Sequence, residues 1–329
     1  MSGGRPSIKG PDEPTYRVPL IDYDVQMNPR IVSLLPGATE TVAALGAIDA
    51  LVGISHECDH PAGVRRVARV STSAVDPHAS SHDIDADVRR LVESGLPVFA
   101  LDAAQIRCLA PTLILTQGLC DVCAVSDGDV RSLGSLIHPA PAILALSGTT
   151  LEGVWRDIAA VGAAIGRTEE ATRLLDDIAR RLRAVHDTLS AARAPRRRVA
   201  VIEWLDPIFA AGHWTPALVR RAGGIDVLAE PGAHSVVMSV AEVRAAQPDL
   251  LLFAPCGFDV ARSARESAAL LATDAWRWAR GVEAWALDGN ALTSRPGPRL
   301  ADAVETIAAI VAPSLFDPPR AEYARRLTA

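Results

Sequence analysis

The chain has 329 residues and a formal net charge of −6, with 49% apolar and 22% charged residues. This length suits two domains better than one small core, and the apolar fraction excludes a disordered chain. The acidic balance argues against a nucleic-acid binder, because such domains usually carry a basic face. We interpret the dense basic run at 193–198 as a solvated helix end and linker.

Residues 1–28 are polar and contain several prolines, so we expect them to form a tail. They show no apolar segment followed by a small-residue cleavage site, and we therefore expect a cytoplasmic protein. No window offers about 18 uninterrupted apolar residues, so we expect no membrane span. The five cysteines are an odd number, which favours free thiols in a reducing compartment over a disulfide framework.

The first half of the chain, 29–148, alternates short apolar runs with helical patterns. Strands are expected at 30–35, 51–55, 97–101, 112–116 and 142–146, and helices near 39–46, 84–94, 103–109 and 125–136. Strands that alternate with helices predict a parallel sheet covered by helices. This half is therefore interpreted as an N-terminal α/β lobe.

A helical connector is predicted over 149–195, since apolar residues recur there at helical spacing. Gly166 divides it into helices near 150–165 and 168–192. The second helix would reach about 35 Å at 1.5 Å per residue, long enough to bridge two lobes.

The remaining chain repeats the first rhythm over 196–315, followed by an expected C-terminal tail at 316–329. Strands are expected at 198–203, 250–253 and 284–287, and helices near 215–222, 240–246, 260–272, 276–280 and 299–311. The sequence thus predicts an α/β fold with two Rossmann-like lobes, each holding a parallel sheet, joined by a long helix.

Polar and sulfur-bearing side chains follow the predicted strands. Ligands bind beyond the carboxyl ends of strands in open parallel sheets, so these residues are candidates to line one cleft between the lobes. The candidate ligand-binding residues are His56, Glu57, Cys58, Glu203, Trp204, His213, Trp214, Cys256, Asp288 and Arg295. Cys108 lies on a short predicted helix instead and is interpreted as a core thiol.

Cysteines and a histidine of the first lobe also offer a metal hypothesis. Cys120 and Cys123 have the spacing of half a zinc site, and His56 with Cys58 would complete four soft ligands for zinc or iron. The alternative is that each buried cysteine serves as a small hydrophobic residue. A redox role for the Cys-x-x-Cys pair is not favoured, because its place in the chain differs from that of thioredoxin-like motifs.

Aromatic and acidic residues of the second lobe bear on ligand type and on catalysis. Trp204 and Trp214 are expected to present flat apolar surface to a large ligand. The other four tryptophans are assigned to the core: Trp155, Trp276, Trp278 and Trp285. Glu203 and Asp206 form a candidate acid/base pair, but dinucleotide, Walker and serine-hydrolase motifs are absent from the sequence, so binding is favoured over catalysis.

Several segments together resemble the vitamin B12-binding, class III solute-binding proteins of ABC importers. The first are Arg30-Ile-Val-Ser-Leu-Leu-Pro-Gly-Ala-Thr-Glu40 and Val52-Gly-Ile-Ser-His-Glu-Cys-Asp-His-Pro61. Others follow in the same order at 111–115, 209–214, 222–228, 240–249 and 295–300, so the resemblance covers about 29–312.

The resemblance implies two rigid lobes that hold a large cofactor, most plausibly cobalamin or a related corrinoid, in a monomer. It also implies that Glu40 and Glu242 are exposed and dock onto arginines of an ABC permease. Family members are usually periplasmic or lipid-anchored, in contrast to the cytoplasmic location expected above.

Three functions remain open at this point. The first is a binding protein for a corrinoid, a haem-like tetrapyrrole or a metal chelate. The second is a cytosolic transition-metal binder that uses the Cys/His cluster. The third is an enzyme that acts on a cofactor-like ligand.

Overall fold

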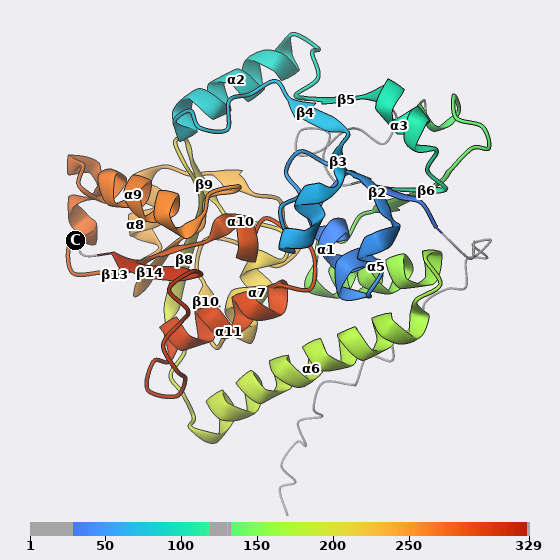
Figure 1. The fold of residues 1–329 in the computed structure, drawn as a ribbon. Helices are drawn as coiled ribbons and strands as arrows, with labels where there is room; N and C mark the ends of the chain where they lie inside the picture. Colours follow the sequence, from blue (N-terminus) through green and yellow to red (C-terminus); the bar gives the residue numbers. More distant parts are fainter. Residues whose placement is uncertain (1–28, 119–129, 131–132, 328–329) are drawn as a thin grey trace, which may run out of the picture.

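The computed structural model describes residues 29–118, 130 and 133–327, and these residues form two α/β lobes. Figure 1 shows lobe 1 in blue and green, lobe 2 in yellow to red, and helix α6 running beneath both. Within the described residues, no helix is both long enough and apolar enough to cross a membrane.

Lobe 1 is built on a fully parallel five-stranded sheet in the order β3-β2-β1-β6-β7. Its strands are β1 (Ile31–Ser33), β2 (Leu51–Ile54), β3 (Ala68–Arg69), β6 (Leu113–Gln117) and β7 (Ala142–Leu146). Helices α1 (Pro36–Ala44) and α3 (Ala103–Leu109) and the 3-10 turns η1 (Ile48–Ala50) and η2 (Ala62–Arg66) complete it. Ile31 and Val32 are buried in separate core clusters, so both faces of the sheet are covered, as is usual for parallel strands.

A separate arm, residues 71–101, extends from lobe 1. It consists of β4 (Ser71–Ser73), α2 (Ser81–Glu93) and β5 (Phe99–Leu101), with β4 and β5 paired antiparallel. The strand expected at 97–101 therefore lies outside the parallel sheet. Val75, Leu91 and Val98 give the arm a small core of its own.

The connector comprises α5 (Leu151–Ala164) and α6 (Thr168–Ala191). The prediction of one continuous second helix is confirmed, and Gly166 adopts a φ of 69° in the turn before it. Ala171 packs into the core of lobe 1, whereas Ile178 and Leu182 pack into the core of lobe 2. Helix α6 thus contacts both lobes.

Lobe 2 has a mixed sheet in the order β11-β9-β8-β12-β13-β14, with β10 also paired to β8. Its parallel strands are β8 (Arg198–Leu205), β10 (Ile225–Asp226), β12 (Leu250–Phe253) and β13 (Glu283–Leu287). Its antiparallel strands are β9 (Ile208–Ala210), β11 (Val236–Val237) and β14 (Ala324–Leu327). Its helices are α7 (Thr215–Arg221), α8 (Val240–Ala245), α9 (Val260–Leu271), η3 (Asp274–Ala279), α10 (Gly289–Leu292) and α11 (Leu300–Val311).

Strand β14 corrects the expectation of a tail at 316–329. It pairs with β13 through residues 324–327, and Ala324 is buried against the core of lobe 2. The segment is only four residues long and half arginine, so its sequence carries no clear strand pattern.

Candidate ligand site at the lobe interface

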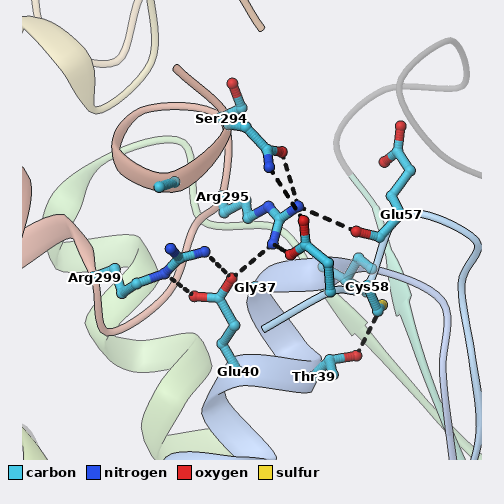
Figure 2. A network of polar contacts seen from close by, with 12 residues as sticks. Gly37, Thr39, Glu40, Glu57, Cys58, Ser294, Arg295 and Arg299 are labelled. Carbon is cyan, nitrogen blue, oxygen red and sulfur yellow. Dashed lines mark hydrogen bonds and ion pairs between the residues drawn. The ribbon is translucent and has the colours of Figure 1, made fainter. Parts of the chain in front are cut away.

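A buried ionic network joins α1 of lobe 1 to the segment before α11 of lobe 2 (Figure 2). Arg299 donates from Nε to Glu40 Oε2 at 2.8 Å and from Nη2 to Oε1 at 2.5 Å, a bidentate pair. Arg295 donates from Nη1 to the same Oε1 at 3.1 Å. Glu40 and Arg295 are each only 4% exposed, so the pairing compensates charges that are held away from water.

Arg295 extends this network to the loop after β2. Its guanidinium donates to Asp59 Oδ1 at 2.5 Å, to the carbonyl of Glu57 at 3.1 Å and to Asn290 Oδ1 at 2.8 Å. Burial raises the pKa of Asp59, but the hydrogen bond and charge of Arg295 outweigh burial and leave the pKa below its usual value. We refer to Glu40, Asp59, Arg295 and Arg299 as the brace.

Backbone contact reinforces the brace. A Cβ atom on Gly37 would lie 2.2 Å from the carbonyl oxygen of Pro296, and one on Gly297 would lie 3.1 Å from the carbonyl oxygen of Gly37. Only glycine at position 37 lets these two segments of the backbone approach this closely. The lobes are therefore held at a fixed separation here.

The brace corrects the expected exposure of Glu40. Its two carboxylate oxygens face Arg295 and Arg299 inside the protein, because the helix α1 that carries it packs directly against lobe 2. Glu242 is exposed as expected, and its carboxylate accepts from Ser239 N at 2.7 Å in the capping box of α8.

Beside the brace, two carboxyl groups and a thiol from both lobes lie near enough for their charges to interact. Glu57 follows β2, Glu203 lies on β8, and Cys256 follows β12, with the Cys256 amide donating to the carbonyl of Glu203 at 3.0 Å. Burial raises the pKa of Cys256 to about 12, with smaller contributions from the negative charges of Glu203 and Glu57, while a hydrogen bond with Ser294 opposes the shift. We refer to Glu57, Glu203, Cys256 and Ser294 as the acidic site.

The acidic site is surrounded by protein but remains accessible to water. Burial raises the pKa of Glu57, and Arg295 opposes this shift. Burial also raises the pKa of Glu203, although Ser235 and the amide of Gly212 donate hydrogen bonds that favour its charged form. Glu57 and Cys256 nevertheless keep exposed surface, so the desolvation is partial. Such groups can accept hydrogen bonds from a ligand that enters between the lobes.

Two histidines adjoin Glu203. The amide of Gly212 donates to Glu203 Oε2 at 3.3 Å, and His213 follows directly in the chain. The ring of His213 meets that of His234 edge to face, with centroids 5.4 Å apart. Burial lowers the pKa of His213, with a smaller effect from His234, so the neutral imidazole is favoured.

His56 lies with the arm instead of joining these histidines. Its Nδ1 is 2.8 Å from Ser71 Oγ and its ring centroid is 5.4 Å from that of Phe99. Burial lowers the pKa of His56, and the charge of Arg69 lowers it further. Asp288 also has a structural task, since its side chain caps α10 by accepting from Ala291 N at 2.7 Å.

The two tryptophans expected to face the ligand differ. Trp214 is only 7% exposed, packs in the core of lobe 2 and donates from Nε1 to the carbonyl of Thr293 at 2.8 Å, so the expected role as an open flat wall is wrong. Trp204 is partly buried, and its Nε1 donates to the carbonyl of Ser81 in the arm at 3.1 Å.

The predicted metal cluster gains no support. Cys58 is fully buried, its Sγ is 3.0 Å from Thr39 Oγ1, and burial raises its pKa to about 11, which disfavours the thiolate a metal needs. Cys120 and Cys123 lie outside the described residues. Among residues 29–118, 130 and 133–327, no three His, Cys, Asp or Glu side chains form a group that could hold a metal. Cys108 is exposed, which corrects its assignment as a core thiol.

Sequence reasoning missed several members of this interface, among them Asp59, Asn290, Ser294 and Arg299. Asp59 and Asn290 stand in the same strand-end segments as Cys58 and Asp288, and Ser294 directly precedes Arg295, so their positions in the sequence carry a usable signal. Arg299 pairs with a residue 259 positions away, and no local pattern signals such a contact.

Comparison with known proteins agrees with this architecture. The family model described as "Periplasmic binding protein" matches residues 105–280. A vitamin B12-binding protein of Vibrio cholerae serotype O1 is 23% identical over 278 residues, which cover 84% of this chain and 87% of that protein.

Solved structures show the same fold. The periplasmic haem-binding protein of Pseudomonas aeruginosa matches with a TM-score of 0.68 and 21% identity, covering 91% of this chain and 99% of that one. The periplasmic vitamin B12-binding protein of Vibrio cholerae matches with a TM-score of 0.58 and 22% identity, covering 86% of this chain and 96% of that one. The family match spans more than half of the sequence, and the chain therefore belongs to the periplasmic binding protein family, with the two-lobed class III fold.

Proposed function

We propose that this protein binds a corrinoid, cobalamin or a close relative, between its two lobes. The proposal draws on membership of the periplasmic binding protein family and on likeness to proteins named for vitamin B12 binding. Other structural neighbours are named for haem binding, so the ligand must be argued from the residues at the lobe interface.

The charge of the acidic site is the observation that carries the choice of a corrinoid. Glu57 and Glu203 lie where the lobes meet. The nearby guanidinium groups are already committed: Arg295 and Arg299 to the brace, and Arg69 to the carbonyls of Ser55 and His56. The described residues thus offer hydrogen-bond acceptors here but no uncommitted cation.

This arrangement suits the edge of a corrinoid better than that of haem. A corrin ring carries amide side chains, whose N–H groups donate to carboxylates, whereas haem carries two propionates that carboxylates repel. Electrostatic complementarity mainly sets specificity, so acidic groups at the rim should select against the anionic ring. Cys256, which keeps exposed surface, and Trp204 add softer and apolar contact area nearby.

Haem remains the second candidate because of the paired imidazoles. His213 and His234 lie edge to face beside Glu203, and His213 favours its neutral form, the form that ligates iron. Under this alternative, a histidine of lobe 2 would bind the iron while the propionates point away from Glu57 and Glu203.

A partnership with an ABC permease is part of the proposal, by analogy with the family. Glu242 is exposed at the start of α8 and is the candidate docking residue on lobe 2. The brace occupies Glu40, so a docking residue on lobe 1 must be sought elsewhere on its surface.

The experiment is a pair of calorimetric and fluorescence titrations, with cyanocobalamin and with haemin. We expect saturable micromolar binding of cyanocobalamin and weaker binding of haemin. Glu57→Lys should weaken cyanocobalamin binding about tenfold, roughly 1.4 kcal/mol, and strengthen haemin binding. Glu169→Lys makes the same charge change at the exposed start of α6 and should alter neither affinity. Tighter binding of haemin than of cyanocobalamin by the unmodified protein would favour the haem alternative.

A further inference from the structure

The arm of lobe 1 makes a second contact between the lobes, distinct from the brace. Arg262 on α9 donates to the carbonyl of Ala79 at 2.6 Å and also to that of Pro77. Trp204 on β8 donates to the carbonyl of Ser81, and Ile84 of α2 packs against the core of lobe 2. Figure 1 shows α2 reaching from β4 and β5 across to the β8 and β9 side of the molecule.

Arg262 is held in the orientation that this contact requires. Its guanidinium carbon lies 3.5 Å from the ring centroid of Phe258, a cation–π arrangement, and its Nε donates to Glu266 at 2.7 Å. The ring of Phe258 in turn lies 5.4 Å from that of Trp204. Arg262, Phe258 and Trp204 therefore form one preorganised contact surface, here called the seat, for the start of α2.

This seat adjoins the acidic site. Trp204 follows Glu203 directly along β8, and Phe258 lies two residues beyond Cys256. The carbonyl of Phe258 accepts from the amide of Asn290, which also belongs to the interface around Arg295. The arm is thus seated at the rim of the proposed ligand site.

The arm contact has the features of an attachment that can release. Apart from Ile84, it rests on hydrogen bonds to backbone carbonyls, which water can replace. The remaining polar contact, between His82 Nδ1 and a carboxylate oxygen of Asp206 at 3.2 Å, has side chains 68% and 61% exposed. The core of Val75, Leu91 and Val98 lies within the arm itself, so the arm can stay folded when it leaves lobe 2.

We infer that the arm is a strap that detaches from lobe 2 to let the ligand exchange, and that Arg262 is its latch. The role in ligand exchange rests on the proposed function, whereas detachment of the arm does not. A latch acts on the rate at which the strap opens, and so on both association and dissociation of the ligand.

Detachment is tested without any ligand, by hydrogen exchange in the full-length protein. Arg262→Ala should speed exchange of the α2 amides at least tenfold and leave amides of α1 and α11 unchanged. Arg265→Ala is the matched control, because Arg265 lies on the same helix but is exposed, and Glu266, at 3.5 Å, is its one polar partner among the described residues. Equal exchange of α2 in the unmodified protein and Arg262→Ala would overturn the strap.

Gating is tested by stopped-flow binding of cyanocobalamin. Arg262→Ala should raise the association and dissociation rates together, each about fivefold or more, with a much smaller change in Kd. A rise in the dissociation rate alone would assign Arg262 to direct ligand contact and overturn the latch. If the unmodified protein binds neither cyanocobalamin nor haemin, the proposed function fails, and the hydrogen-exchange comparison still decides whether the arm detaches.

Discussion

The brace and the arm contact both join the lobes, but they differ in burial and in redundancy. The brace holds Glu40 and Arg295, each 4% exposed, and Glu40 is shared between two guanidinium groups. The arm contact relies on hydrogen bonds to backbone carbonyls and on the contact between His82 and Asp206, whose side chains are more than half exposed. The lobes are thus joined at three places: by the connector α6, by the brace and by the arm contact. We expect the first two to persist, whereas the arm contact is suited to opening.

The difference between the two contacts shows how the lobes can keep a fixed arrangement while a ligand still enters and leaves. Breaking the brace would leave buried charges unpaired, which is strongly unfavourable, so the two lobes stay together at the brace. Breaking the arm contact exposes polar groups that water can satisfy. Motion is therefore expected at the arm, while the separation of the two lobes stays constant.

Removing the shared carboxylate should have the largest effect. Glu40→Gln leaves Arg299 without a counter-charge and Arg295 with Asp59 alone, and we expect a loss of about 3–5 kcal/mol in the free energy of unfolding. Urea denaturation measures this loss, with the exposed substitution Glu93→Gln as control. A loss no larger than that of the control would mean that the brace does not hold the two lobes together.

A methyl group on Gly37 should wedge the lobes apart. Its Cβ would meet the carbonyl oxygen of Pro296 at 2.2 Å, and overpacking of this kind costs about 1–3 kcal/mol. Gly63→Ala is the matched control, because its Cβ would meet only the flexible end of Ile48, at 3.1 Å. Thermal unfolding compares the two variants, and equal melting temperatures would contradict a close backbone contact.

Acid should weaken the brace through Asp59. The pKa of Asp59 is lower in the folded protein than in the unfolded chain, so its contribution is present above about pH 4 and is lost as pH falls through the folded pKa. The stability difference between the unmodified protein and Asp59→Asn should therefore be constant near neutral pH and shrink below about pH 4. A difference that grows with acidification would contradict the pairing with Arg295.

Substitutions in the arm contact should cost less than those in the brace. Trp204→Phe keeps an aromatic ring but loses the hydrogen bond to Ser81, which is worth about 1 kcal/mol. His82→Ala removes only an exposed pair, and we expect a change below about 0.5 kcal/mol. Both substitutions should clearly speed hydrogen exchange of the α2 amides. They should change the melting temperature of the whole protein only slightly. If exchange in α1 and α11 speeds up as much as exchange in α2, the arm does not open separately from the rest of the protein.

Local pattern was sufficient to predict most of the fold. The strands at 51–54 and 142–146 and the continuous helix α6 follow from apolar runs and helical spacing. The rule that ligands bind beyond parallel strand ends also selected Glu57, Glu203 and Cys256, and the charges of both carboxylates reach the Cys256 thiol.

Contacts between distant segments could not be predicted this way. Glu40 looked like a surface carboxylate because its partners Arg295 and Arg299 lie more than 250 positions away. Trp204 and Trp214 both follow predicted strand ends, so their sequence positions do not distinguish them. Packing buries Trp214 in the core of lobe 2, whereas Trp204 contacts the arm. The antiparallel pairing of β5 with β4 likewise depends on a turn of the chain through α2.

Hydrogen exchange with and without cyanocobalamin tests the ligand site between the lobes most directly. We expect saturating cyanocobalamin to slow exchange in peptides that contain Glu57, Glu203 and Cys256, and in α2, because the ligand covers the site and the strap closes over it. Peptides of α1, which carries Glu40, and of α11, which follows Arg299, are already protected and should not change. Protection confined to one lobe, or no protection by cyanocobalamin where haemin gives it, would contradict a corrinoid held between the lobes.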